Sequence, residues 1–167
     1  MRRAERDGYN NTVTKFPRAP QRLTLLYIRD PLYFVTCCAY RRRPILAQTR
    51  FHDAVVDFVG RAETEFGIAV GRYVILPDHL HLFVSPSEHI ELGRWIGTLK
   101  RITGRFIKPV DSPDPIWQRG FFDHVLRNTE SYSQKWEYVR NNPVRAGLVT
   151  DPGDWPFFGE IAPLSFA

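Results

Sequence analysis

The chain has 167 residues, of which 43% are apolar and 14% aromatic, and this is the size and composition of one globular domain with a buried core. It contains neither an apolar run long enough to span a bilayer nor, in residues 1–7, the hydrophobic stretch of a signal peptide, so we expect a cytoplasmic protein with no membrane partner. Cys37 and Cys38 are adjacent, which argues against a disulfide framework or a paired zinc clamp.

The net charge of +5 arises near the N-terminus. Residues 1–43 contain ten of the 23 Lys and Arg residues but three of the 18 acids. Such a stretch attracts polyanions, although it can equally be a solvated tail that keeps the protein soluble. Residues 1–22 keep neither helical nor strand spacing, so we predict a mobile basic arm there and a single domain over residues 23–167.

Residues 31–84 alternate between strand and helix patterns. A run rich in aromatic and β-branched residues precedes apolar residues at the three-and-four spacing of an amphipathic helix, and two more strand-like runs follow. The predicted elements are a strand at 31–40, a helix at 51–66, and strands at 68–76 and 79–84. Pro77 and Asp78 are a turn signal, so the last two strands are expected to form a hairpin.

The second half of the chain continues this alternation. Its predicted elements are a helix at 92–108, a proline-rich loop at 109–115, a strand at 117–127 bent at Gly120, and a helix at 130–142 stopped by Pro143. The whole order predicts an α+β, ferredoxin-like βαββαβ fold, with an antiparallel sheet, helices on one face and an extra C-terminal helix.

Positive charge also dominates the predicted helix at 92–108. It carries five cations, and Glu91 just before it is the one acid nearby. An ordinary solvated helix face mixes the two signs, so this bias favours contact with phosphate groups. The candidate phosphate-contacting residues, together with the arginine triplet after the first strand, are Arg41, Arg42, Arg43, Lys100, Arg101, Arg105 and Lys108.

Two histidines, His79 and His81, are separated by one leucine in the strand at 79–84. Successive side chains of a strand point to opposite faces, so the two imidazoles share a face. The alternative is that one histidine lies in the core and the other on the surface. Because the pair follows a Pro-Asp turn directly, we favour the hypothesis that it binds a divalent metal.

Tyr138 and Asn142 lie four residues apart in the last predicted helix and therefore share a face. Trp136 and Val139 point to other sides and can anchor the helix, which leaves Tyr138 available for chemistry. Amphipathic packing is the alternative for a helical tyrosine, and an asparagine before a proline is also an ordinary helix-end signal.

Three ordered motifs resemble the single-tyrosine His-hydrophobic-His (HUH) transposases, above all the branch of REP-associated tyrosine transposases. They read YVILPDHLHLF at 73–83, WQRGFFDHVLR at 117–127 and YVRNNPVRAGLV at 138–149. The resemblance covers about residues 31–155. It implies a metal-dependent transposase or endonuclease that cleaves and rejoins single-stranded DNA through a 5′-phosphotyrosine intermediate, at hairpin-forming repeat sequences.

The resemblance also implies roles for individual residues. His79, His81 and Asn142 would bind Mg²⁺ or Mn²⁺, which suit two imidazoles and one amide oxygen without excluding zinc, and Tyr138 would be the nucleophile. The candidate phosphate-contacting residues would then hold single-stranded or hairpin DNA. We expect a nucleoid-associated monomer or homodimer.

Parts of these motifs have no assigned role or depart from the family. Asp123 and His124 belong to the second motif, and packing and DNA contact are equally open for them. Asp78 stands where an asparagine is commoner, Val139 replaces a frequent isoleucine, and residues 154–159 differ from the ending that relatives often have.

Two other functions remain open. A catalytically silent, domesticated DNA-binding protein could keep the same motifs. An RNA-binding module would share the strand and helix order, but its Lys/Arg-Gly-aromatic signature is absent and the corresponding strand carries the two histidines.

Overall fold

The structure is a computed structural model that describes residues 31–107, 113–164 and 166. The basic arm predicted at residues 1–22 and the candidate contact Lys108 lie outside the described residues. Among the described helices, none combines the length and the apolar character that crossing a bilayer requires.

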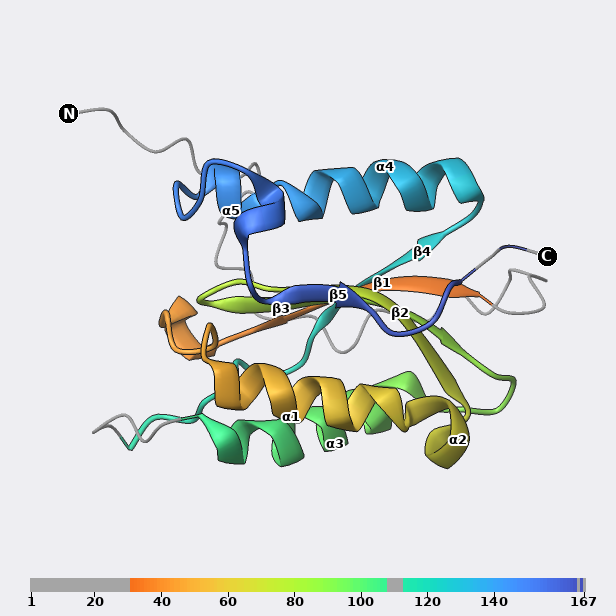
Figure 1. The fold of residues 1–167 in the computed structure, drawn as a ribbon. Helices are drawn as coiled ribbons and strands as arrows, with labels where there is room; N and C mark the ends of the chain where they lie inside the picture. The colour runs from red at the N-terminus through yellow and green to blue at the C-terminus, as the bar shows by residue number, and fades with distance from the viewer. Residues whose placement is uncertain (1–30, 108–112, 165, 167) are drawn as a thin grey trace.

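A five-stranded antiparallel sheet forms the centre of the fold, with its strands in the order β4-β1-β3-β2-β5 (Figure 1). The strands are β1 Leu32–Cys38, β2 Ile68–Ile75, β3 His79–Pro86, β4 Phe122–Leu126 and β5 Phe158–Glu160. The first four strands have the ferredoxin-like arrangement, which confirms the predicted α+β class. The edge strand β5, which pairs with β2, was not predicted.

Helices lie on both sides of this sheet (Figure 1). The helices of one side are α1 Thr49–Gly60, α2 Ala62–Phe66 and α3 Leu92–Thr103, and those of the other are α4 Thr129–Arg140 and α5 Asn142–Arg145. Short 3-10 turns are η1 Tyr40–Arg42, η2 Gly104–Phe106 and η3 Pro152–Asp154. The sheet is therefore the middle layer of three, with α4 on the side opposite to α1 and α3.

The main core lies between the sheet and the pair α1 and α3. Both helices bury the apolar stripe that their spacing predicts, and the buried side chains are Phe51, Val55, Phe58 and Val59 on α1 and Leu92, Trp95, Ile96 and Leu99 on α3. A second cluster lies under α4, where Tyr132 and Trp136 pack on Phe83. Burial of apolar area on both sides holds the layers together.

Several predicted elements are interrupted or shorter than expected, among them the helix at 92–108, whose α-helical part ends at Thr103. The helix at 51–66 is interrupted at Arg61, the cap residue between α1 and α2, whose guanidinium pairs with Asp57 and Glu65 on either side of the break. The strand predicted at 117–127 begins at Phe122, because Gly120 has a left-handed backbone (φ 74°) that turns the chain just before it.

The helix predicted at 130–142 also ends early. It stops at Arg140, and Pro143 lies in the first turn of the next helix, α5. Proline lacks an N–H group, so it fits where a helix begins and its N–H groups have no intrahelical partner. Pro143 therefore starts a short helix instead of stopping a long one.

Candidate active site

His79 and His81 begin strand β3, directly after the hairpin turn. The backbone N–H of Leu76 donates to the carbonyl oxygen of His79 at 2.8 Å, which closes the Pro77-Asp78 turn as predicted. Strand alternation then places both imidazoles on the face of the sheet that α4 covers, with ring centroids 4.6 Å apart. Their exposed fractions are 9% and 4%. The structure thus confirms that the two rings lie side by side.

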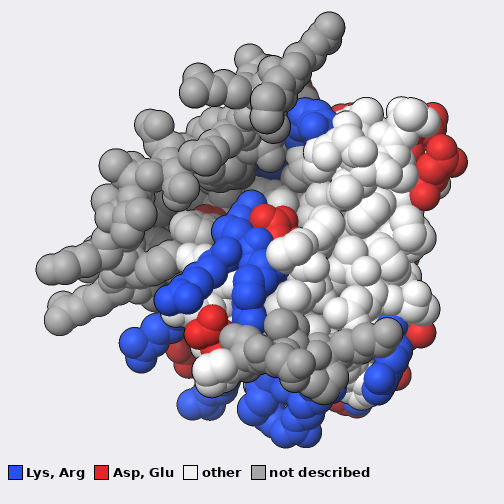
Figure 2. Space-filling view, turned by 90° about the vertical axis from the view of Figure 1, so that its left-hand side faces the viewer, with Lys and Arg blue, Asp and Glu red and all other residues white. Residues whose placement is uncertain are grey.

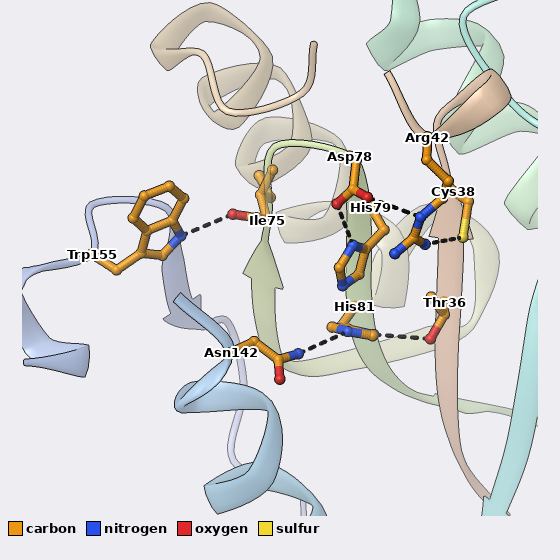
Figure 3. Close-up of polar contacts among 9 residues, drawn as sticks. All are labelled: Thr36, Cys38, Arg42, Ile75, Asp78, His79, His81, Asn142 and Trp155. Carbon is orange, nitrogen blue, oxygen red and sulfur yellow. Dashed lines mark hydrogen bonds and ion pairs between the residues drawn. The ribbon is translucent and has the colours of Figure 1, made fainter. Parts of the chain in front are cut away.

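Each imidazole is oriented by a neighbour at Nδ1 (Figure 3). His79 Nδ1 lies 2.7 Å from Asp78 Oδ1, and His81 Nδ1 lies 2.9 Å from Thr36 Oγ1. A hydrogen bond at one ring nitrogen fixes the ring and leaves the other nitrogen as the ligand atom, the usual arrangement at metal sites. In both histidines the atom left for a ligand is Nε2.

Asp78 is itself held by Arg42. The guanidinium Nε lies 2.9 Å from Asp78 Oδ2, and Nη1 donates to Cys38 Sγ at 3.0 Å (Figure 3). Burial on its own raises the pKa of Asp78, but the hydrogen bond to His79 and the charges of His79 and Arg42 together bring that pKa below its ordinary value. Asp78 is therefore an ionised acceptor for His79.

His81 is kept neutral by its surroundings. Burial, followed by the positive charges of its neighbours, lowers the pKa of His81 well below its ordinary value. The ring stacks on Phe34 at a centroid distance of 5.0 Å. Its Nε2 accepts a hydrogen bond from Asn142 Nδ2 at 3.2 Å. A neutral imidazole has the lone pair that metal binding requires.

Asn142 reaches this site from the start of α5, and it contacts His81 although 61 positions separate the two residues in the sequence. Its side chain is buried, and its Oδ1 accepts a hydrogen bond from Arg145. The amide nitrogen and not the oxygen faces His81, but a half-turn of the amide exchanges the two atoms. His79, His81 and Asn142 thus come together as predicted.

Tyr138 lies near the end of α4 with 43% of its surface exposed. The Arg145 guanidinium stacks 4.0 Å from the centre of its ring and donates to the Tyr138 carbonyl oxygen at 2.8 Å. Arg145 therefore contacts both Tyr138 and Asn142. Trp136 and Val139 are buried and anchor the helix, in agreement with the prediction.

Two cations beside Tyr138 were missed in the sequence. Arg145 lies three residues after Asn142, and Lys135 lies three residues before Tyr138 with its Nζ 5.8 Å from the ring centre. Residues three apart on a helix are neighbours. That spacing is the signal that could have identified them.

The described candidate phosphate-contacting residues lie in or directly after two elements, η1 and the segment formed by α3 and η2. Exposed Arg101 and Arg105 belong to α3 and η2, on the side of the sheet opposite to the histidines. The ammonium group of Lys100 donates to the carbonyl oxygens of Gln118, at 2.9 Å, and Gly120. It therefore ties α3 to the segment before β4. Whether these residues contact DNA stays a prediction.

The arginine triplet surrounds η1 at one end of the sheet. Arg41 lies 3.7 Å from Asp114, Arg42 binds Asp78, and Arg43 donates to the carbonyl oxygen of Pro115. Figure 2 views this end of the molecule and shows Lys and Arg side chains gathered there with a few acids among them. Their contact with DNA also stays a prediction.

The site offers three ligands to a metal. Among the residues that the structure describes, no group of three or more His, Cys, Asp and Glu side chains could hold an ion. For a metal, His79 and His81 would need a third ligand of another kind, and the amide of Asn142 lies next to His81 with its nitrogen toward the ring. Two oriented imidazoles and one amide oxygen fit a divalent cation with open coordination positions.

Comparison with known proteins gives consistent matches. The family model described as "Transposase IS200 like" matches residues 31–142. The REP-associated tyrosine transposase of Escherichia coli (strain K12) is 28% identical over 133 residues, which cover 78% of this chain and 77% of that protein. A Haemophilus influenzae (strain ATCC 51907 / DSM 11121 / KW20 / Rd) protein is 26% identical over 149 residues, covering 78% of this chain and 80% of its own length.

Solved structures agree with these sequence matches. The structure of a REP-associated tyrosine transposase bound to a REP hairpin is similar with a TM-score of 0.63 and 25% identity, over 80% of this chain and 78% of that one. A crystal structure of a Deinococcus radiodurans R1 protein has a TM-score of 0.51 at 16% identity, over 69% of this chain and 92% of that one. The second likeness concerns the fold alone.

Proposed function

This chain belongs to the family of IS200-like transposases, and we propose that it is a REP-associated tyrosine transposase that cleaves and rejoins single-stranded DNA through a 5′-phosphotyrosine link. The observation that carries the proposal is the placement of Tyr138. Its exposed side chain stands one helical turn before Asn142, which contacts His81 in the cluster of metal-binding type. A nucleophile beside such a cluster suits phosphodiester chemistry.

Hairpin-forming repeats are the proposed DNA substrate. The related protein of known structure is bound to a REP hairpin. Among the residues described here, Lys135 and Arg145 place positive charge beside Tyr138. Cations at this position can hold the phosphate that is to be cleaved, whatever the base sequence around it.

We assign metal binding to His79 Nε2, His81 Nε2 and Asn142 Oδ1, which would face the metal after a half-turn of the amide that breaks its hydrogen bond from Arg145. When bound, Mg²⁺ or Mn²⁺ supplies positive charge that polarises the scissile phosphate. Asp78 and Thr36 hold the imidazole rings in orientation through their hydrogen bonds to Nδ1. Arg42 keeps Asp78 ionised and in position.

Tyr138 carries out the covalent step. Its Oη attacks the phosphorus atom, the bond from phosphorus to the 3′ oxygen breaks, and the proton lost by the phenol ends on the departing 3′ oxygen, which becomes the 3′-hydroxyl. The 5′ end is then held as a phosphotyrosine ester, and attack by another 3′-hydroxyl reverses the step without ATP. Arg145, stacked on the ring, stabilises negative charge on Oη and on the phosphate oxygens.

A covalent-trapping experiment tests this proposal. The protein is incubated with hairpin DNA that has a labelled single-stranded flank, with Mn²⁺ or with EDTA, and adducts are separated on a denaturing gel. We expect a Mn²⁺-dependent adduct with the wild type and with Tyr132→Phe, which removes the hydroxyl of a tyrosine that is buried in the same helix. We expect none with Tyr138→Phe.

Two outcomes would contradict the proposal. Tight hairpin binding without cleavage in any metal would support the catalytically silent DNA-binding protein. Cleavage that persists in Tyr138→Phe would show that water or another residue attacks the phosphate.

A further inference from the structure

Strand β4, at the edge of the sheet, exposes an aromatic side chain that the proposed chemistry does not use. Phe122 has 52% of its surface exposed, more than Tyr138. His124, two residues later, is also exposed, whereas Leu126 is buried under α4. One exposed aromatic side chain is common on a protein surface, so its position relative to the functional site decides whether it can bind a ligand.

The pairing of the strands places Phe122 in line with the histidine site. Thr36 on β1 is paired with His81 on one side and with Phe122 on the other. Residues paired directly across a sheet point to the same face, so the three side chains form one row. Two strand spacings of about 4.8 Å separate the ends of the row by about 10 Å. Nucleotides next to the scissile phosphate can reach that far.

Helix α4 covers only part of this face. Its aromatic residues Tyr132 and Trp136 pack on Phe83 of β3, and Trp136 also contacts Phe158 of β5. The helix therefore leans toward the β2 and β5 side of the sheet. Phe122 and His124, on the other side of the site, both keep exposed surface.

We propose that Phe122, together with His124, is a stacking platform for unpaired nucleobases that adjoin the scissile phosphate. The inference rests on the proposed function and specifies how the single-stranded flank is bound. Proteins bind single strands by stacking bases on aromatic side chains and holding the backbone with cations. Exposed Arg119 and Arg127 stand just before and just after β4 and provide such cations.

The test compares three DNA ligands in EDTA, so that binding is measured without cleavage. They are a hairpin with a single-stranded flank, the same hairpin without the flank, and the flanked hairpin with abasic positions near the cleavage point. The variants are Phe122→Ala, Phe122→Trp and, as a matched control, Phe106→Ala, which removes an aromatic group that is 42% exposed in η2.

For Phe122→Ala we expect the affinity for the flanked hairpin to fall about 5-fold to 100-fold, the usual loss for one stacked base. Affinity for the hairpin without the flank should stay unchanged. An abasic position at the stacked base should weaken the wild type by a similar factor and leave Phe122→Ala unaffected. Phe122→Trp should restore binding, and Phe106→Ala should match the wild type.

The proposal is overturned if Phe122→Ala binds the flanked hairpin like the wild type, or weakens both hairpins equally. It is also overturned if the substitution changes the oligomeric state and not the affinity, because edge strands can pair with a second copy. Failure of the proposed function would look different. In that case the wild type would form no adduct. If only the stacking proposal fails, the wild type still forms the adduct, and only the role of Phe122 in binding the flank is lost.

Discussion

The two faces of the sheet differ in what they bury. The face toward α1 and α3 is closed by aliphatic and aromatic side chains, and its buried polar residue, Thr103, bonds to the carbonyl oxygen of Leu99 one turn earlier. The face toward α4, which we call the open face, buries His79, His81 and Asn142 and leaves Tyr138 exposed. Described polar residues that are buried thus concentrate on one side.

This difference suggests that one face of the sheet mainly stabilises the fold and the other mainly serves the chemistry. Buried imidazole and amide groups are costly to desolvate, so their hydrogen bonds offset a loss that apolar packing would not incur. The closed face makes the larger apolar contribution to folding. We infer that the α1 and α3 face holds the fold while the α4 face keeps polar groups in fixed positions for catalysis. Substitutions on the closed face should therefore mainly lower the free energy of unfolding, and substitutions on the open face should mainly lower metal binding or the cleavage rate.

The largest effect on stability is expected for Phe51→Ala on the closed face. Phe51 is fully buried, and replacing such a phenylalanine costs about 3–5 kcal/mol. That is a large share of the roughly 5–15 kcal/mol that holds a typical domain. Urea denaturation should show a strongly reduced free energy of unfolding. Tyr138→Ala on the open face should change it by about 0.5 kcal/mol or less, and equal losses in the two variants would refute the division between faces.

The next effect concerns metal affinity on the open face. Asp78→Asn removes the ionised partner of His79 Nδ1, and loss of such a partner typically weakens metal binding about 10-fold to 100-fold. Titration of Mn²⁺ by calorimetry measures the change. His79→Ala and His81→Ala should abolish binding, with Phe51→Val as a control that changes the closed face. Unchanged Mn²⁺ affinity in both histidine variants would remove the metal site from the account.

A smaller effect is expected for Arg145→Lys. Lysine keeps the charge but loses the planar group that stacks on Tyr138 and donates to its carbonyl oxygen. At saturating DNA and Mn²⁺ we expect the cleavage rate to fall about tenfold, because misplacement of a reacting group slows the chemical step. DNA affinity should hardly change. Arg101→Lys on α3 is the matched control, and equal rates in both variants would show that Arg145 does not position the site.

The smallest effect is a pH dependence on the closed side of the molecule. Burial lowers the pKa of His52 although the charge of Asp53 opposes it, and His52 Nε2 lies 2.8 Å from the Tyr73 hydroxyl. As the pH falls, His52 takes up a proton at a higher pH in the unfolded chain than in the folded one. The free energy of unfolding therefore keeps its full value above about pH 6.5 and declines below it. Urea denaturation from pH 7.5 to 5 should show a weaker decline in His52→Gln. Parallel curves would contradict this assignment.

Much of the fold could be predicted because the spacing of apolar residues and the turn residues are local features of the sequence. The strands around the Pro77-Asp78 turn and the stripes of α1 and α3 follow directly from spacing. Strand β5 could not be predicted, since three residues carry no clear alternation and their strand form depends on pairing with β2. Pro143 was misread because the same residue is compatible with the end of one helix and the start of another.

The sequence named candidate residues for the site but did not show their contacts. His81 and Asn142 come into contact only when the chain folds. The resemblance to known motifs, and not their spacing, was the reason to assign them to one site. Lys100 and Arg145 show the complementary limit. Both are charged residues in helices, yet one binds backbone carbonyls and the other stacks on Tyr138. A sequence pattern shows charge without showing the partner of that charge.

The identity of the residue that carries the DNA is the most direct test of the central claim. The adduct formed with hairpin DNA and Mn²⁺ is trapped, digested and sequenced by mass spectrometry. Tyr132 is the internal comparison, because it lies in the same helix but is 5% exposed and packs on Phe83. The account predicts the nucleotide on Tyr138. A nucleotide on Tyr132, or cleaved DNA with no nucleotide on any tyrosine, would contradict it.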